Sequence, residues 1–258
     1  MAINSVERSD EIGAIQCAFD CGITSFDTAP IYANGEAEGL LGHALRGTRR
    51  DYVQIITKIH PCEASIKLTA MECESSLFRM GLDYIDLYLV HWRGPLPLEE
   101  TVEALESLRS DGKIREWGVS NFDRTDILEL LEIRKRDFPL VNQVLFNPIR
   151  REAESRLLSQ DIGSVALMGY SPFERDRGLD ITPFMAIAQR NGVTAHAVLL
   201  AWILSKGVSP VFKSTRADHI RANASALNIT LAEDDIDTIE AYFPKPENPE
   251  RIEREDTI

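Results

Sequence analysis

The sequence predicts a single α/β domain in which parallel strands and helices form a (β/α)8 barrel of the TIM type. Three observations support this fold class. Short apolar runs alternate with longer segments of helical period, which is typical of strands joined by crossover helices. The strand runs are apolar on both faces, as expected of a parallel sheet covered by helices. The chain has 258 residues, close to the roughly 250 residues of one such barrel.

Each expected element has its own pattern in the sequence. The strands are short apolar runs at Ile23–Thr28, Tyr52–Ile59, Ile85–His91, Ile114–Ser120, Val141–Phe146, Val165–Tyr170 and Val208–Lys213. The helices show apolar residues at three- and four-residue spacing. They are expected at Glu11–Asp20, Ala37–Leu45, Ile66–Met80, Glu99–Arg109, Arg124–Ile133, Arg151–Ser159, Pro183–Arg190, Ala195–Leu204, His219–Leu227 and Glu233–Tyr242.

Glycines mark the expected helix ends, since glycine readily adopts the left-handed conformation found there. Gly22, Gly81 and Gly112 each follow a helical segment and precede a strand or turn.

No GxGxxG motif follows the first expected strand, so nothing indicates a Rossmann dinucleotide site. A barrel is therefore favoured over an open doubly wound sheet.

Both ends of the chain depart from the regular pattern. Eight strands close a barrel of this type, and the sequence offers seven good candidates after an opening helix. We expect that the first strand is missing, or that Met1–Val6 is a poor substitute for it. Residues 244–258 are rich in Pro and acidic residues and show no period. We expect them to form an irregular acidic tail on the single domain 1–258.

Charge and cysteine content exclude several classes of protein. The formal net charge is -13, so diffuse attraction to nucleic acid or to anionic lipid is not expected. The sequence contains no long apolar run and no secretion signal, which favours a cytoplasmic protein without a membrane partner. Cys17, Cys21, Cys62 and Cys73 lack CxxC spacing, which argues against a structural zinc site and a disulfide framework. The oligomeric state stays open between a monomer and a weak homo-oligomer.

Polar residues occur at the carboxyl ends of the first three expected strands. Asp27, Lys58 and His91 end these strands, and Tyr32 lies in the loop after Asp27. Because the carboxyl ends of barrel strands meet at one face, we expect these side chains to lie together. Tyrosine can protonate the oxygen of a carbonyl during hydride transfer if a nearby cation stabilises the phenolate. Lys58 would be that cation, Asp27 would hold it, and neutral His91 would orient the carbonyl.

A basic cluster in this acidic chain predicts where a phosphate-bearing cofactor binds. Lys213, Ser214, Arg216, His219 and Arg221 follow the last expected strand and open a helix. The N-terminus of a helix favours phosphate, and cations next to it add to the attraction. We therefore expect the phosphate groups of the cofactor at this place.

The same residues resemble the signature of the aldo-keto reductase family. The matching segments follow the family's order and spacing from about Glu11 to Phe243: Phe26–Tyr32 with Gly35, Glu36, Glu38, Leu41 and Gly42, then Thr57–Lys58, Leu89–Trp92, Gly112–Asn121, Asn142–Gln143, Gly169–Pro172 and Lys213–Ser214. The resemblance is closest to the bacterial branch that reduces methylglyoxal and other small aldehydes. It implies NADPH-dependent reduction of small aldehydes and ketones, with Asp27, Tyr32, Lys58 and His91 as the catalytic tetrad.

The resemblance also implies the residues that bind the cofactor, and it implies no metal. Ser120, Asn121 and Gln143 would hydrogen-bond the nicotinamide carboxamide, and Tyr170 would stack on the ring. Ser171 would lie along the pyrophosphate and Asn223 at the adenine. Lys213, Ser214, Arg216 and His219 would surround the 2′-phosphate of NADPH. Trp92 would line the substrate pocket.

Several positions differ from the family pattern. The opening hairpin and strand of the family have no counterpart in this chain. His219 stands where many members have arginine, and Ala222 stands where a polar side chain helps to hold the adenine, so the choice between NADPH and NADH stays open. The short loop after Trp92 predicts a shallow, open substrate pocket.

Two other functions are compatible with the residues. One is a regulatory or partner subunit that binds NADP(H) without turnover. The other is a different barrel enzyme, a lyase or isomerase, that uses Lys58 as a Schiff-base amine. The physiological carbonyl compound and the direction of the reaction are not specified by the sequence.

Overall fold

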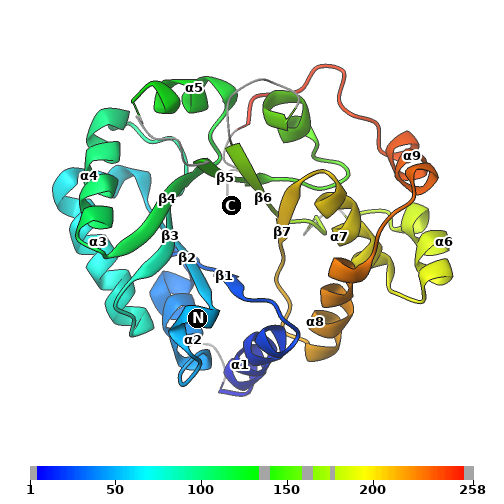
Figure 1. The fold of residues 1–258 in the computed structure, drawn as a ribbon, viewed down its shortest axis with the longest axis horizontal. Coiled ribbons are helices and arrows are strands. Elements are labelled where there is room, and N and C mark those ends of the chain that lie inside the picture. The colour runs from blue at the N-terminus through cyan, green and yellow to red at the C-terminus, as the bar shows by residue number, and fades with distance from the viewer. Residues whose placement is uncertain (1–4, 134–139, 159–164, 175–177, 253–258) are drawn as a thin grey trace.

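The computed structural model describes residues 5–133, 140–158, 165–174 and 178–252. Its strands form one parallel sheet in the order β1 to β7, so that each strand pairs with the next along the chain. The strands curve around a common centre and the helices lie outside them (Figure 1). The predicted barrel arrangement is confirmed, with β1 and β7 as the outer strands of the described sheet.

The strands agree with the predicted segments to within a few residues. They are β1 Ser25–Asp27, β2 Gln54–Ile59, β3 Ile85–Val90, β4 Ile114–Ser120, β5 Leu140–Leu145, β6 Val165–Tyr170 and β7 Val208–Val211. The parallel register pairs Asp27 with Ile56 and Lys58 with Leu89. It therefore brings the carboxyl ends of β1, β2 and β3 to the same face of the molecule.

The helices that cover the sheet also follow the prediction, except at two ends. The helices are α1 Ser5–Asp20, α2 Glu36–Ala44, α3 Ile66–Met80, α4 Leu98–Ser110, α5 Arg124–Ile133, α6 Thr182–Asn191, α7 Ala195–Ser205, α8 Ala217–Ala224 and α9 Glu233–Tyr242. Helix α1 begins six residues before the expected Glu11, and α8 ends three residues before the expected Leu227. In helix α3, residues next to each end determine where the helix begins and ends. Ser65 caps its first turn by accepting a hydrogen bond from the Leu68 N–H, and Gly81 ends it in the left-handed conformation.

The core lies between the sheet and the helices and holds large aromatic side chains. Trp117, Phe146 and Trp202 are at most 1% exposed, and the rings of Phe146 and Trp202 stack with centroids 5.8 Å apart. Helix α7 is buried from Ala197 to Ile203, which its continuous apolar sequence requires. Within the described parts of the chain, no helix is long and apolar enough to cross a membrane.

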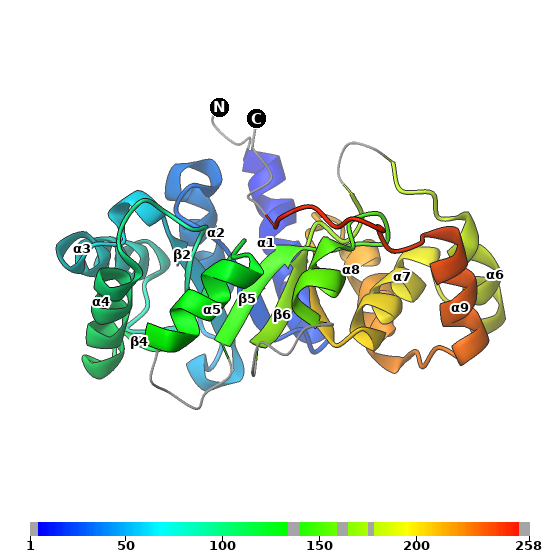
Figure 2. The ribbon, with the colours of Figure 1, turned by 90° about the horizontal axis from the view of Figure 1, so that it is seen from above.

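Three expectations need correction or completion. Ser5 and Val6 lie in α1, so they do not take part in a substitute first strand, and Met1–Asn4 lie outside the described residues. The expected helix Arg151–Ser159 contains a π-helix at Glu154–Leu158, and Ser159 is not described. The described part of the tail is irregular, but it is anchored at its end, where Ile252 is 8% exposed. Figure 2 shows this segment running from α9 back across the barrel.

Candidate active site

The side chain of Lys58 forms the centre of the candidate site. It projects from β2 near the carboxyl end of the strand, and only 1% of the side chain is exposed. Its ammonium donates hydrogen bonds to both carboxylate oxygens of Asp27, at 2.8 and 2.7 Å, and to the carbonyl oxygen of Thr28, at 2.9 Å. These acceptors match the three protons of a charged lysine. The ammonium is therefore held in a fixed position at the end of the sheet.

Tyr32 and His91 complete the predicted group of four. The Lys58 ammonium lies 5.1 Å from the centroid of the Tyr32 ring. The rings of Tyr32 and His91 meet edge to face with centroids 5.9 Å apart. Tyr32 is 40% exposed, whereas His91 is 8% exposed. An accessible phenol thus lies close to a buried cation and beside a buried imidazole.

The backbone of the loop that carries Tyr32 is strained. Ala33 and Asn34 have left-handed conformations, with φ of 49° and 53°. A left-handed conformation costs roughly 1–2 kcal/mol for each residue that has a side chain. Such strain is common at functional sites and persists where the surrounding structure imposes it.

The residues predicted to bind nicotinamide form a hydrogen-bonded series next to this group. Gln143, from β5, donates to Asp27 Oδ1 at 2.9 Å. Asn121 donates to the carbonyl oxygen of His91 at 3.1 Å and to Ser120 Oγ at 3.0 Å. Tyr170, from β6, donates through its hydroxyl to Asn121 Oδ1 at 2.9 Å. The carboxamides at the ends of β4 and β5 are therefore connected directly to the group around Lys58.

Ser171, predicted to lie along the pyrophosphate, follows β6 in a left-handed conformation with φ of 51°. Its carbonyl oxygen accepts a hydrogen bond from Asn147 Nδ2 at 3.0 Å, and Asn147 also donates to Glu174 Oε2 at 2.7 Å. Both Asn147 and Glu174 are buried. The sequence analysis missed these two residues because neither belongs to a spacing pattern.

The predicted phosphate residues lie at the other side of the sheet, after β7. The side chain of Lys213 is 80% exposed and its ammonium lies 3.5 Å from Glu11 Oε1. Arg216 is 64% exposed and pairs with Asp218 at 2.6 Å. The hydrogen bond from Arg216 lowers the pKa of Asp218 to about 2. The cations thus stand in solvent at the start of α8, paired with nearby carboxylates.

The other residues of this predicted phosphate and adenine site differ in burial. Ser214 Oγ accepts a hydrogen bond from the Arg216 N–H at 3.1 Å, which fixes the turn into α8. His219 is exposed and Asn223 is 7% exposed. His196, on α7, was not predicted; burial and the nearby charge of His219 lower its pKa. Two cations and a helix N-terminus at an open surface fit the phosphate of a dinucleotide.

Trp92, the predicted substrate residue, lies beside His91, with ring centroids 4.9 Å apart. His60 packs edge to face against the other side of this pair, 4.8 Å from the Trp92 ring. The sequence analysis missed His60, although it follows β2 directly and so lies at the face where the site was expected. Position at a strand end was the signal that could have identified it.

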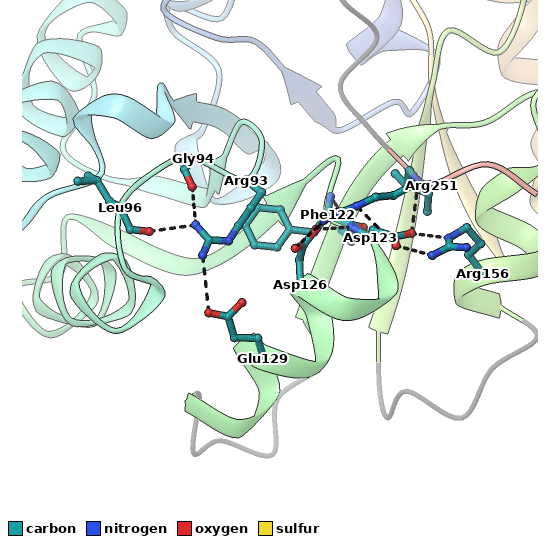
Figure 3. A network of polar contacts seen from close by, with 11 residues as sticks. Arg93, Gly94, Leu96, Phe122, Asp123, Asp126, Glu129, Arg156 and Arg251 are labelled. Carbon is teal, nitrogen blue, oxygen red and sulfur yellow. Dashed lines mark hydrogen bonds and ion pairs between the residues drawn. The ribbon is translucent and has the colours of Figure 1, made fainter.

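A charged network joins the end of β4 to the C-terminal segment (Figure 3). Arg156 donates to both carboxylate oxygens of Asp123, which also accepts from the Ile252 N–H at 3.3 Å. Arg251 pairs with Asp126 at 3.0 Å. Because Asp123 follows the loop of Asn121, this network fixes both the tail and the loop beside the site.

Comparisons with known proteins cover nearly the whole chain. The model of the aldo/keto reductase family matches residues 1–243. A methylglyoxal reductase of Escherichia coli (strain K12) is 36% identical over 253 residues, which are 95% of this chain and 89% of that protein. A glyoxal reductase of Bacillus subtilis (strain 168) is 35% identical over 242 residues, 93% of this chain and 87% of that protein. An aldo/keto reductase from Klebsiella pneumoniae, crystallised with NADP and acetate, has a TM-score of 0.89 at 37% identity, covering 98% of this chain and 92% of that one.

Proposed function

The chain belongs to the aldo/keto reductase family, and we propose that it reduces small aldehydes and ketones to alcohols with NADPH. One observation carries this proposal. An exposed tyrosine ring lies 5.1 Å from a buried ammonium, and that ammonium is bonded to both oxygens of an aspartate. This arrangement suits a phenol that gives up its proton during the reaction.

Each of the four residues has a distinct part in proton delivery. NADPH, when bound, supplies the hydride that reduces the carbonyl carbon. Tyr32 donates its proton to the oxygen as negative charge develops there. Lys58 stabilises the phenolate that remains, and Asp27 holds Lys58 in place. His91 orients the carbonyl by a hydrogen bond to its oxygen.

Other residues of the site fit the parts of the dinucleotide. The carboxamides of Asn121 and Gln143, with the hydroxyl of Ser120, offer donors and acceptors to the nicotinamide amide, and the ring of Tyr170 offers a stacking surface. Ser171 follows β6 towards the pyrophosphate. Four residues around the start of α8 suit the 2′-phosphate: Lys213, Ser214, Arg216 and His219. Asn223, on the same helix, suits the adenine.

Small α-oxoaldehydes are the substrate class that we propose first. The relatives from Escherichia coli and Bacillus subtilis are named for methylglyoxal and glyoxal reduction. Trp92, next to His91, would line the substrate side of the site. The cytoplasm is the compartment that we predict for this reaction.

The geometry of Lys58 disfavours the Schiff-base alternative. Its three hydrogen bonds use the protons of a charged ammonium, whereas a lysine nucleophile needs a free amine. A carbonyl compound would also have to displace Asp27 and Thr28 to reach Nζ.

The proposal is tested by following NADPH oxidation with methylglyoxal, glyoxal and an aromatic aldehyde, together with direct measurement of NADPH binding. We expect steady turnover that yields the corresponding alcohol. NADPH binding without turnover of any carbonyl would contradict the proposal and would support the subunit that binds the cofactor without catalysis.

A further inference from the structure

A second group of polar side chains, two of them buried, lies next to the loop that carries Tyr32. Glu38, in the first turn of α2, is 0% exposed. Its carboxylate accepts hydrogen bonds from the Thr57 hydroxyl at 2.7 Å and from Arg79 Nε at 2.6 Å. Thr57 directly precedes Lys58 on β2, and Arg79 lies in the last turn of α3. One carboxylate therefore connects α2, α3 and the strand of Lys58.

Arg79 also packs against the loop between Tyr32 and α2. A Cβ atom at position 35 would lie 2.7 Å from Arg79 Cδ and 3.0 Å from Arg79 Nε. The arginine is held there by Glu38 and by Ser76 Oγ, which accepts a hydrogen bond from its terminal nitrogen at 3.0 Å. Gly35 is thus required both by its φ of +86° and by the close approach of Arg79.

Tyr32 is 40% exposed, so its backbone contributes to where its ring lies beside Lys58 and His91. The two residues after it have left-handed conformations, and Gly35 is the third in succession. A run of this kind is maintained by contacts at its ends. At the end nearer to α2, the contact comes from Arg79, which Glu38 holds in place.

We propose that Glu38 and Arg79 are positioning residues for the Tyr32 proton donor, an inference that rests on the proposed function. Arg79 fixes Gly35 and with it the end of the loop. Glu38 ties this end to Thr57, the neighbour of Lys58. Together they set where the phenol lies relative to the ammonium. Both act through Gly35 and Thr57 rather than on the substrate.

The test compares two glycine substitutions that have the same backbone cost. Gly35 and Gly47 have φ of +86° and +87°, but a Cβ at Gly47 would meet no atom within 4 Å. Gly35→Ala should push against Arg79 and displace the loop, whereas Gly47→Ala should not. We expect Gly35→Ala to lower kcat about 10- to 100-fold, with NADPH Kd within about twofold of the wild type. Gly47→Ala should have the same backbone cost without the clash, and it should leave kcat unchanged.

Arg79→Lys provides a second variant that keeps the positive charge next to Glu38. The lysine cannot reproduce the Nε hydrogen bond or the packing over Gly35, so kcat should again fall with little change in NADPH Kd. Glu38→Gln keeps the shape of the side chain and should retain most of the activity. A third measurement needs no cofactor: the ring resonance of ¹³C-labelled Tyr32 should shift in Gly35→Ala and Arg79→Lys but not in Gly47→Ala.

The outcomes separate this inference from the proposed function. A wild-type protein without turnover would refute the proposed function, while the Tyr32 resonance would still test the positioning. If the wild type turns over and Gly35→Ala matches Gly47→Ala in kcat and in the Tyr32 resonance, the inference is wrong. It is also wrong if kcat falls only in proportion to the folded fraction. Should Gly35→Ala fail to fold, Arg79→Lys decides by the same criteria.

Discussion

The region around Lys58, on β2, and the region around Lys213, after β7, differ in how far their charged side chains are buried. The side chains of Lys58 and Asp27 are 1% and 10% exposed and bind each other. The side chains of Lys213 and Arg216 are 80% and 64% exposed and pair with nearby carboxylates. The first region is held together by its own buried contacts. The second offers charges that can exchange their partners for a phosphate.

This difference indicates that the two regions contribute to different steps, one to the chemical step and the other to cofactor binding. Removing one partner of a buried ion pair lowers the stability of the fold strongly, whereas an exposed pair contributes little to stability. Mutations around Lys58 should therefore affect the chemical step and folding together. Mutations around Lys213 should affect cofactor affinity alone.

The largest effect is expected from Lys58→Met. The substitution removes the cation next to Tyr32 and leaves the Asp27 carboxylate buried without a counter-ion. We expect turnover to fall by a factor of about 10²–10⁴ and the free energy of unfolding to fall by about 3–5 kcal/mol. Urea unfolding and NADPH oxidation measure the two effects separately. The double variant with Asp27→Asn should recover part of the stability and none of the turnover. Turnover close to wild type in either protein would contradict the role of Lys58.

The next effect concerns the exposed side of the site. Arg216→Ala should raise the Kd for NADPH roughly tenfold, since a hydrogen-bonded charge pair with phosphate is lost. The Kd for NADH and the kcat at saturating NADPH should stay close to wild type. Lys67→Ala, which removes an exposed cation on α3, is the matched control. Equal losses for NADPH and NADH would show that Arg216 does not bind the 2′-phosphate.

A smaller effect of opposite sign is expected from Asp218→Asn. Freed from Asp218, Arg216 should bind phosphate better and lower the Kd for NADPH a few-fold. Because the pKa of Asp218 is lowered to about 2 by the Arg216 hydrogen bond, its carboxylate stays ionised at pH 5. The Kd for NADPH of Asp218→Asn and of the wild type is compared at pH 8, where the 2′-phosphate carries its full charge. A weaker affinity in Asp218→Asn would refute the competition between the two partners.

The smallest effect is expected on the stability in acid, where two aspartates that each pair with an arginine can be compared. Burial would raise the pKa of Asp123, but hydrogen bonds from Arg156 and from backbone N–H groups lower it below its ordinary value. The stability that this gives is fully present above the pKa of an unfolded aspartate, about 4, and is lost as the pH falls through the lower folded value. Asp123→Asn should thus reduce the loss of stability in acid, measured by urea unfolding from pH 7 to pH 3. The pKa of Asp218 is lowered as well, but its pair with Arg216 is exposed and contributes little, so Asp218→Asn should reduce the loss in acid by less than Asp123→Asn. An equal or larger effect of Asp218→Asn would contradict the comparison.

Much of the fold could be predicted because buried parallel strands leave a strong pattern. The expected bounds of Ile114–Ser120 and Val165–Tyr170 are those of β4 and β6, and the other inner strands, β2, β3 and β5, differ from their expected bounds by one or two residues. The expected strand Ile23–Thr28 is shorter in the structure, where β1 spans Ser25–Asp27. As an outer strand of the described sheet, β1 pairs only with β2, so its ends are less well defined.

The site was predictable where it depends on topology. Asp27, Lys58 and His91 lie together because parallel strands bring their carboxyl ends to one face. The supporting contacts were not predictable. The bond from Gln143 to Asp27, the carbonyl of Thr28 and the contact of Arg79 with Glu38 join positions far apart in the chain. No spacing rule links such pairs, because the three-dimensional packing of the loops determines them.

The central claim is that the exposed phenol of Tyr32, which lies next to the buried Lys58 ammonium, delivers the proton. The most direct test is a single turnover of bound NADPH with methylglyoxal in Tyr32→Phe, with NADPH Kd measured on the same protein. We predict that NADPH binds with a Kd within about twofold of the wild type and that its oxidation slows by a factor of about 10²–10⁴. Oxidation at the wild-type rate in Tyr32→Phe would contradict the account.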